Sequence, residues 1–363
     1  MKELFLLDPE VVFLNHGSFG ATPRPVFEAY QRYQLALERN PVEFLGRQFP
    51  ELIDAARTRL AAYVGADPDG LVFVPNATAG VNVVARSLRL RPGDEVLASD
   101  REYGAVDILW RFVCERAGAS YVLRPPGELW DAVTERTRVI SVSHISSPTA
   151  EILPVEVLCR RAREAGILTV VDGAHGPGQL PLDLNALGAD AYAGNCHKWL
   201  CAPKGAGFLW ASPALRDLLE PLIVSWDWER ETEFAARHRW QGTRDPAACL
   251  AVPDAIDFLA EHDWDAVRAR CHALAAHAQA GIGEWAGTEP PSGPFAQMAA
   301  AQLPPCDPEE VQRRLREEHA IEVPCKEWQG LPLIRVSLQG YNDEADVERL
   351  LAALLELDAF QPQ

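Results

Sequence analysis

The stretch Ala193-Gly194-Asn195-Cys196-His197-Lys198-Trp199 decides the fold once it is taken together with Val170-Val171-Asp172-Gly173-Ala174-His175. An apolar run over residues 167–171 ends on Asp172, which is typical of a buried strand with a carboxylate at its C-terminal end. A second short strand, over residues 189–193, leads into a polar turn that carries Lys198. The sequence therefore predicts an aspartate and a lysine at the ends of neighbouring strands.

This pair allows two interpretations. In the first, the two residues form an ordinary salt bridge or stay solvated in their loops. In the second, they form a site for pyridoxal phosphate (PLP), in which a lysine amine joins the cofactor as a Schiff base. The aspartate then keeps the pyridine nitrogen protonated, so that the ring withdraws electrons. The rest of the chain decides between the two.

Length and composition indicate an ordinary globular protein. The chain has 363 residues, of which 48% are hydrophobic and 24% are charged, and this length suggests two domains or one large domain with a small one appended. Lys and Arg number 34 against 52 Asp and Glu, for a net charge of −18. Nucleic acids and anionic membranes bind basic surfaces, so neither is an expected partner.

The cysteines and the N-terminus favour a cytoplasmic location. The first residues lack the charged, apolar and small-residue layout of a signal peptide, and no apolar run approaches the roughly 18 residues of a membrane-spanning helix. The eight cysteines are scattered without the spacing of a metal site, so no metal is expected. In a chain of this length they are expected to be reduced thiols.

Strands and helices alternate through most of the chain. The predicted strands cover residues 71–75, 95–98, 119–123, 139–143, 167–171 and 189–193, and the predicted helices cover residues 25–39, 51–64, 81–88, 106–117 and 155–165. This rhythm predicts an α/β fold with a mostly parallel sheet covered by helices on both faces.

Polar residues recur where these strands end. They are Asn76, Thr78, Glu102, Tyr103, His144, Asp172, His175 and Lys198. Ligands of open α/β sheets bind at the carboxyl ends of the strands, so this repetition favours the cofactor site over the salt bridge. The turn after residue 75 is either an anion site at a helix N-terminus or a simple capping turn, since Asn76 and Thr78 both suit an N-cap.

The last third of the chain changes character. Helices are predicted over residues 247–259, 264–286, 308–319 and 344–357, with a Pro/Gly-rich stretch over 287–294 and short strands near 297–302 and 333–337. This pattern predicts a small α+β domain made of residues 1–19 and 256–363, beside a large PLP-binding domain over residues 20–255. The Gly-rich turn at 203–207 is not a dinucleotide fingerprint, which argues against a nicotinamide-dependent dehydrogenase.

A set of motifs, in this order, resembles the class V aminotransferase family of PLP-dependent enzymes. They are Asn76-Ala77-Thr78, Glu102-Tyr103-Gly104-Ala105, the segment 143–149 (Ser-His-Ile-Ser-Ser-Pro-Thr), Asp172-Gly173-Ala174-His175, His197-Lys198-Trp199, the segment 242–246 (Gly-Thr-Arg-Asp-Pro) and the segment 335–342 (Arg-Val-Ser-Leu-Gln-Gly-Tyr-Asn). Within the family the likeness is to the isopenicillin N epimerase-like branch, related to cysteine desulfurases and lyases. The resemblance runs from about residue 14 to 351 and implies fold type I, with a seven-stranded-type sheet.

The resemblance implies roles for the residues around the cofactor ring. Lys198 would be the Schiff-base lysine, and Asp172 would pair with the pyridine nitrogen. Tyr103 would stack over the ring, where desulfurases have a histidine, and tyrosine is a poorer proton donor at neutral pH. His144 and His175 would contact the phenolic oxygen and neighbouring atoms.

The resemblance also implies phosphate and substrate contacts. The phosphate ligands would be Ala77, Thr78, Asn195 and His197, with Thr243 reaching in from the other subunit of a homodimer whose active sites lie at the interface. Arg335 would bind the substrate's α-carboxylate through its forked guanidinium. Asn15, His16 and Gly17 would border the substrate entrance.

The expected activity is chemistry at the α-carbon of an amino acid or amino-acid-like substrate, through an external aldimine and loss of the α-proton to Lys198. Epimerisation is the main expectation. The alternatives are β-elimination by a cysteine desulfurase or C–S lyase, transamination, and, in a different class, a PLP-fold module that binds a ligand without turnover. Cys325 is expected to be a buried or strand-end residue, whereas a desulfurase needs a mobile, reactive cysteine. The joint presence of Lys198, Asp172 and Arg335 argues against the binding module.

Overall fold

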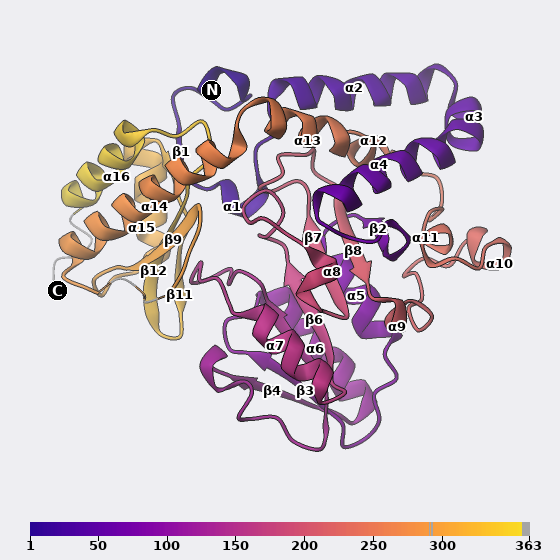
Figure 1. Cartoon of the computed structure of the whole chain (residues 1–363). Helices are drawn as coiled ribbons and strands as arrows, with labels where there is room; N and C mark the ends of the chain where they lie inside the picture. The colour runs from indigo at the N-terminus through magenta and orange to yellow at the C-terminus, as the bar shows by residue number, and fades with distance from the viewer. Residues whose placement is uncertain (290, 292, 358–363) are drawn as a thin grey trace. The chain divides into compact units, whose positions relative to one another are not determined.

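The computed structural model describes residues 1–289, 291 and 293–357. The chain forms two compact units (Figure 1). The large unit comprises residues 25–145 and 153–258, and the small unit comprises residues 1–24, 146–152 and those from 259 onward. The predicted domain boundaries did not include the excursion of residues 146–152 into the small unit.

A seven-stranded sheet forms the centre of the large unit. Its strands are β2 (Leu71–Val74), β3 (Glu95–Ser99), β4 (Ser120–Arg124), β5 (Thr137–Ser143), β6 (Leu168–Gly173), β7 (Ala191–Asn195) and β8 (Gly207–Ala211), in the order β2-β8-β7-β6-β5-β3-β4. All pairs from β4 to β7 are parallel, and β8 is antiparallel to both of its neighbours. The predicted mostly parallel sheet is confirmed.

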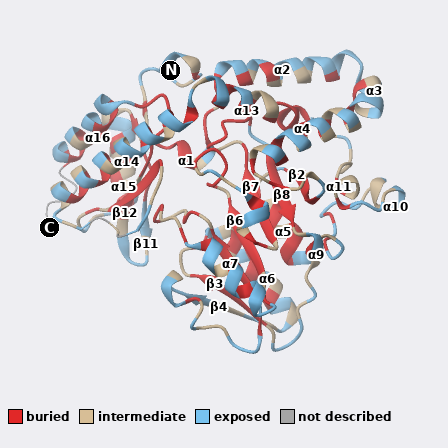
Figure 2. Ribbon diagram, viewed as in Figure 1, coloured by how far each residue is buried: buried red, intermediate tan, exposed pale blue. Residues whose placement is uncertain are grey.

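Both faces of this sheet are covered. All five residues of β3, of β7 and of β8 are buried, and successive side chains of a strand point to opposite faces. Figure 2 shows the same run of buried residues along the central strands. The main connecting helices are α5 (Ala77–Ser87), α6 (Gly104–Ala117) and α7 (Val155–Glu164). Further helices of this unit include α4 (Phe49–Tyr63), α12 (Ala247–Leu250) and most of α2 (Arg24–Arg39) and α13 (Val252–Glu261).

The small unit contains two small sheets and three long helices. An antiparallel sheet has the order β11 (Cys325–Trp328), β12 (Leu331–Ser337) and β9 (Met298–Gln302), and β1 (Val12–Phe13) pairs in parallel with β10 (Ile321–Glu322). The helices are α14 (Trp264–Ala286), α15 (Pro308–His319) and α16 (Glu344–Glu356). Residues 146–152 are tied to this unit by a hydrogen bond of 2.7 Å from the Ile152 amide to the Pro294 carbonyl. The predicted small α+β domain is therefore present.

The structure departs from the predicted helix over residues 247–259. It breaks at Ala251 into α12 and α13. Pro253 has no N–H to donate inside a continuous helix, whereas the first turn of a new helix tolerates proline. No helix in the described part of the chain is both long enough and apolar enough to cross a membrane.

Candidate active site

The ends of β5, β6 and β7 bring the predicted residues to one edge of the large sheet. Asp172, near the end of β6, is level with Ser143 on β5 and with Ala193 on β7. Lys198 follows β7 by three positions. Asp172 and Lys198 therefore lie at or just after the ends of neighbouring strands, as the strand pattern predicted.

Lys198 contacts a histidine from the neighbouring strand end. Its Nζ lies 3.3 Å from His175 Nε2. The other ring nitrogen, Nδ1, accepts a hydrogen bond of 3.1 Å from Trp199 Nε1. The sequence singled out Lys198 and His175 but gave Trp199 no role, because a buried tryptophan more often fills a core.

Asp172 is a buried carboxyl group that is only 5% exposed. Its Oδ1 accepts a hydrogen bond of 2.9 Å from the Ala174 amide. Burial raises the pKa of Asp172, while this hydrogen bond and the positive charge of Lys198 act in the opposite direction. A cation placed against the carboxylate would oppose the effect of burial further.

His144 and Tyr192 form a second pair at this edge. His144 Nδ1 and the Tyr192 hydroxyl are 3.1 Å apart. Burial lowers the pKa of His144 to about 4, so the ring is neutral near pH 7, and burial raises the pKa of Tyr192. The Tyr192 side chain fills the space above Gly173 and Gly176: an added Cβ would come within 2.0 Å of the ring at Gly173 and within 2.1 Å of the hydroxyl at Gly176. The sequence missed Tyr192, although the glycines of the aspartate motif were a signal that something packs closely there.

The N-terminus of α5 presents the predicted phosphate residues. Asn76 caps the helix, with its Oδ1 accepting from the Ala79 amide at 2.9 Å. The Ala77 amide donates to Asn195 Oδ1 at 2.8 Å, so two predicted phosphate ligands are paired with each other in this structure. Thr78 occupies the second helical position, where amides have no partner inside the helix. The helix dipole adds partial positive charge at this end.

The other predicted cofactor residues differ in their surroundings. His197 Nδ1 donates to the Ala206 carbonyl at 3.1 Å, and burial lowers the pKa of this histidine to about 4. Tyr103 immediately precedes α6 and is 47% exposed. Thr243 is exposed in the segment between α11 (Phe234–Arg237) and α12. The cofactor contacts predicted for Tyr103 and Thr243 stay predictions.

Glu102 lies beside these groups, although the sequence gave it no role. It is buried, and its carboxylate accepts hydrogen bonds from Ser99 Oγ and, at 2.6 Å, from Ser143 Oγ. Burial raises the pKa of Glu102 to about 7, the two serine hydroxyls act against this shift, and the negative charge of Asp172 adds to it. Glu102 is therefore an acid that titrates near neutral pH.

In the small unit, Arg335 on β12 has an incompletely paired guanidinium. It donates to the Ser147 carbonyl, to Ser147 Oγ at 3.2 Å and to Ser18 Oγ at 3.4 Å. Its buried Nε has no hydrogen-bond partner, and burial lowers its pKa to about 10. A buried N–H without a partner is costly, and a carboxylate is the acceptor that a guanidinium fork fits best.

Asn15 and His16 are buried and hydrogen-bonded within the small unit, and their predicted place at the substrate entrance stays a prediction. Asn15 accepts from Ser18 Oγ at 2.5 Å and donates to Glu322 at 3.1 Å. His16 is fully buried, with its ring nitrogens 3.0 Å from the Tyr341 hydroxyl and 3.3 Å from Gln339 Nε2. The pairing of β1 with β10 draws this segment into the interior of the small unit. Asn15 therefore orients Ser18 beside Arg335.

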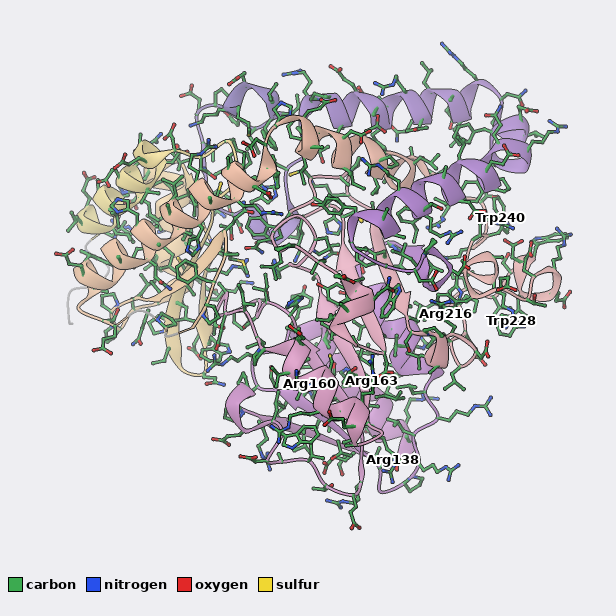
Figure 3. All side chains as sticks on the ribbon, in the orientation of Figure 1. Arg138, Arg160, Arg163, Arg216, Trp228 and Trp240 are labelled. Atoms are coloured by element: carbon green, nitrogen blue, oxygen red, sulfur yellow. The ribbon has the colours of Figure 1, made fainter. Side chains whose placement is uncertain are left out.

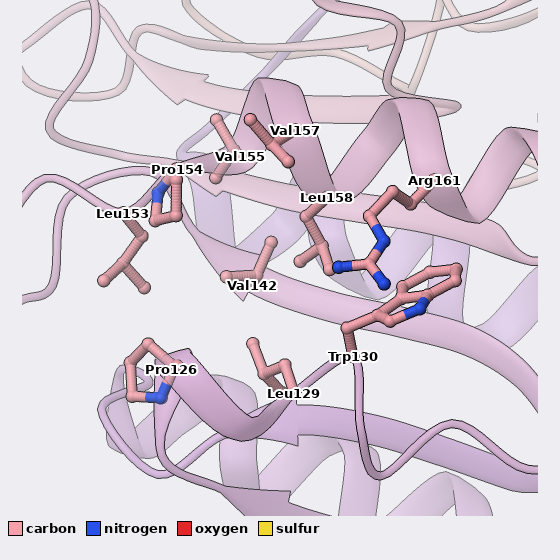
Figure 4. A pocket seen from close by; sticks show the side chains of 11 residues that line it. Pro126, Leu129, Trp130, Val142, Leu153, Pro154, Val155, Val157, Leu158 and Arg161 are labelled. Atoms are coloured by element: carbon pink, nitrogen blue, oxygen red, sulfur yellow. The ribbon is translucent and has the colours of Figure 1, made fainter.

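A separate cavity of about 180 Å³ lies near the start of α7 (Figure 4). Apolar side chains from residues 126–130 and 153–158 line it, and the Arg161 guanidinium stacks at 4.2 Å over the Trp130 ring. None of the predicted site residues lines this cavity. The described residues also contain no group of three or more His, Cys, Asp or Glu side chains that could hold a metal ion.

Comparison with known proteins agrees with this arrangement. The family model "Aminotransferase class-V" matches residues 12–350. The chain belongs to the class V aminotransferase family. It is a PLP-dependent enzyme, as expected from the motifs that carried the resemblance.

Two relatives of this class V enzyme are isopenicillin N epimerases. The protein from Amycolatopsis lactamdurans is 40% identical over 388 aligned residues, covering 98% of this chain and 97% of the relative. The protein from Streptomyces clavuligerus is also 40% identical, covering 96% and 95%. A probable cysteine desulfurase from Xylella fastidiosa (strain 9a5c) is 28% identical, covering 96% and 91%.

Solved structures share the fold of the class V enzyme. The cysteine desulfurase CsdA from Escherichia coli superimposes with a TM-score of 0.83 at 24% identity, covering 97% of this chain and 96% of that one. The cystine C–S lyase C-DES gives a TM-score of 0.84 at 22% identity, covering 96% and 98%. The likeness confirms the predicted fold type.

The residues of the large unit fit PLP. The cofactor needs an amine, a buried acid for its ring nitrogen and an anion site for its phosphate. The chain supplies Lys198, the buried carboxyl of Asp172 and the positive end of α5 from one region of the large unit. This chain therefore has the set of groups that PLP requires.

Proposed function

We propose that the protein is a PLP-dependent epimerase that inverts the α-carbon of an amino-acid-like substrate of the isopenicillin N type. The observation that carries this proposal is the 40% identity to two isopenicillin N epimerases over nearly the whole of each chain. The site supports it, because reaction at the α-carbon requires an amine that exchanges a proton and a carboxylate that keeps the pyridine nitrogen of PLP protonated.

The proposed roles follow from the positions of the side chains. Bound PLP supplies an electron-poor ring that takes up the negative charge left when the α-proton departs. Lys198 would hold the cofactor covalently and, once released, would accept the α-proton, and inversion then requires that a solvent-derived proton is delivered to the opposite face of the α-carbon. Asp172 keeps the pyridine nitrogen protonated, and its backbone hydrogen bond fixes the orientation of the carboxylate. His144 and His175 orient the cofactor ring, and Tyr103 stacks on it.

Phosphate and carboxylate groups are held by separate parts of the chain. The α5 N-terminus with Thr78, together with His197, binds the phosphate, and Asn195 holds the Ala77 end of that helix in place. Arg335 binds the substrate's carboxylate, since its buried Nε still lacks an acceptor. Ser18 and Ser147 fix the guanidinium so that little side-chain entropy is lost on binding.

The cysteines favour an epimerase over a desulfurase. Persulfide chemistry needs an accessible thiolate. Cys325 is 2% exposed at the start of β11, and its backbone amide donates a hydrogen bond of 2.9 Å to Gln312 Oε1. Burial raises the pKa of Cys325 and also of Cys306, the least buried of the eight thiols. The expected placement of Cys325 is confirmed.

We infer a homodimer in which Thr243 serves the partner's site. Exposed apolar side chains support it: Ile108 and Phe112 on α6, and Leu222, Ile223, Val224 and Trp226 in the segment between β8 and α12. Trp228 and Trp240 lie in that same segment (Figure 3). The eight free thiols fit a reducing compartment, so we propose a cytoplasmic location.

The decisive experiment offers isopenicillin N and a panel of L- and D-amino acids and cysteine conjugates to the purified holoenzyme in deuterated water. Chiral chromatography should find inverted product that carries one deuterium at the α-carbon. Pyruvate with sulfide would instead indicate a C–S lyase or desulfurase, and a keto acid would indicate an aminotransferase. Binding spectra without any product from the whole panel would indicate a ligand-binding module.

A further inference from the structure

The indole of Trp199 is the nearest neighbour of the reacting residues that the chemistry above leaves unused. Trp199 follows Lys198 in the chain and is fully buried. Its Nε1 lies 3.1 Å from His175 Nδ1, and Lys198 Nζ lies 3.3 Å from His175 Nε2. The three side chains therefore form one continuous series, with the imidazole in the middle.

The chemistry of the indole fixes the direction of the first bond. An indole N–H can only donate a hydrogen bond, so His175 Nδ1 must present its lone pair to Trp199. A neutral imidazole then carries its proton on Nε2, the nitrogen that faces Lys198, and this N–H can donate to Lys198 only when the lysine nitrogen is uncharged, because an ammonium group has no lone pair. A doubly protonated ring would place an N–H group of His175 against the N–H group of Trp199, which this contact opposes.

The surrounding backbone fixes the position of His175 relative to Trp199. His175 is buried, and its carbonyl accepts from Gln179 Nε2 at 2.9 Å. Gly178 has φ +86° and lies so close to the Trp199 backbone that an added Cβ would be 2.2 Å from the Trp199 carbonyl oxygen. The turn that follows His175 therefore packs directly on Trp199, whose indole N–H donates to the His175 ring.

We propose that Trp199 is a positioning residue that holds His175 as the neutral tautomer protonated on Nε2, so that a proton and not a lone pair faces Lys198. This inference rests on the proposed role of Lys198 as the reacting amine. His175 then donates to whatever acceptor occupies that position and does not compete with Lys198 as a base. Trp199 thus determines that His175 is the donor and Lys198 is the base, although Trp199 itself is proposed to touch neither substrate nor cofactor.

Nitrogen NMR of the histidine rings tests the tautomer without any reaction. The apo and PLP-loaded proteins are labelled with ¹⁵N-histidine, and His175→Gln identifies the His175 signals among the nine histidines. In the PLP-loaded protein we expect a protonated Nε2 and a bare Nδ1 that persist through the range of about pH 5 to 8 in which free histidine titrates. A wild-type ring protonated on Nδ1, or one that becomes doubly protonated in this range, would overturn the proposal.

Trp199→Phe then tests whether Trp199 is what sets the His175 tautomer. Phenylalanine keeps most of the ring volume but cannot donate, so the His175 ring should shift to protonation on Nδ1 or to the doubly protonated form. The kcat–pH profile of the loaded enzyme should move with it. Trp110→Phe is the matched control, because Trp110 is also fully buried and loses a hydrogen bond of 2.8 Å to Ser141 Oγ without touching His175.

The outcomes separate the tautomer from the proposed reaction. An unchanged His175 spectrum in folded Trp199→Phe protein would show that Trp199 only fills space. A changed spectrum, together with a reactive amine found elsewhere than at position 198, would leave the tautomer assignment standing and remove the role of Lys198. If Trp199→Phe fails to fold, the wild-type spectrum still decides the protonation site.

Discussion

Because of its raised pKa, the buried carboxyl of Glu102 makes the free energy of unfolding depend on pH. Its pKa is raised from 4.5 to about 7, so the folded chain binds more protons than the unfolded chain between those values. The stabilisation is complete below pH 4.5 and is lost as the pH rises through 7. A shift of this size corresponds to about 3 kcal/mol of unfolding free energy.

Glu102→Gln should remove that dependence. Denaturant unfolding between pH 4.5 and 8 should give a difference between variant and wild type that grows in favour of the variant as the pH rises. Ser99→Ala should move the loss to higher pH, because the Ser99 hydroxyl helps to stabilise the charged form. A difference that does not vary with pH would contradict the raised pKa.

Lys198 is the residue on which the reaction depends. In Lys198→Ala, borohydride reduction of the PLP-loaded protein should leave no pyridoxyl label at this position, and turnover should fall by at least ~10³-fold, because the covalent site and the base are lost together. Lys204→Ala is the matched control, six positions further along the same loop. Label found on a peptide without residue 198 would remove Lys198 from the site.

Single residues could be predicted where a strand pattern fixes their place, and not where packing does. Asp172 and Lys198 were predicted because each ends a strand, and the sheet brings strand ends together. The burial of His16 could not be predicted, because it accompanies the pairing of β1 with β10, a contact between residues about 300 positions apart. Tyr192 and Trp199 act through ring contacts that have no signature in a local pattern.

The N-terminus of α5 combines stability with anion binding. Asn76→Ala removes the cap on the Ala79 amide and should cost about 1 kcal/mol of unfolding free energy. It should also weaken PLP binding several-fold, because the phosphate is proposed to sit at this helix end. Chemical unfolding of the apo protein and titration with PLP measure the two effects separately.

A cap in the small unit supplies the control for Asn76→Ala. Asp307 caps α15 by accepting from the Glu309 amide at 2.9 Å and the Glu310 amide at 3.4 Å. Asp307→Ala should lower stability by a similar amount and leave PLP affinity unchanged. Equal loss of PLP affinity in both variants would mean that α5 contributes only through global stability.

Long elements could be predicted closely, and short ones could not. The bounds of α14 and α15 equal the predicted ranges 264–286 and 308–319, since helical periodicity accumulates over many residues. β10 has two residues, too few for a period to emerge, and β11 has four of which only Cys325 is buried, unlike the fully apolar β2, so neither was predicted. The transfer of residues 146–152 to the small unit depends on the bond from Ile152 to Pro294, which no local pattern encodes.

At the scale of the whole molecule, the exposed side of α6 carries two large apolar side chains, Ile108 and Phe112, among charged residues. Ile108 is 67% exposed and Phe112 is 49% exposed, and their spacing of four residues places them on the same side of the helix. The opposite side, with Val106 and Trp110, is already buried in the core of the large unit. We propose that a copy of the same chain packs on this exposed apolar pair.

Ile108→Glu combined with Phe112→Glu should therefore dissociate the protein. Light scattering should give twice the 40.0 kDa chain mass for the wild type and a single chain mass for the double variant, because two desolvated carboxylates per chain oppose the contact. Activity should fall with the dimer, since Thr243 is proposed to serve the partner's site. Leu355→Glu on α16, where the leucine is 71% exposed, makes the same kind of change on the small unit and should leave both mass and activity intact. A wild-type protein of single-chain mass, or a double variant that keeps the mass of the pair, would contradict this assignment of the α6 face.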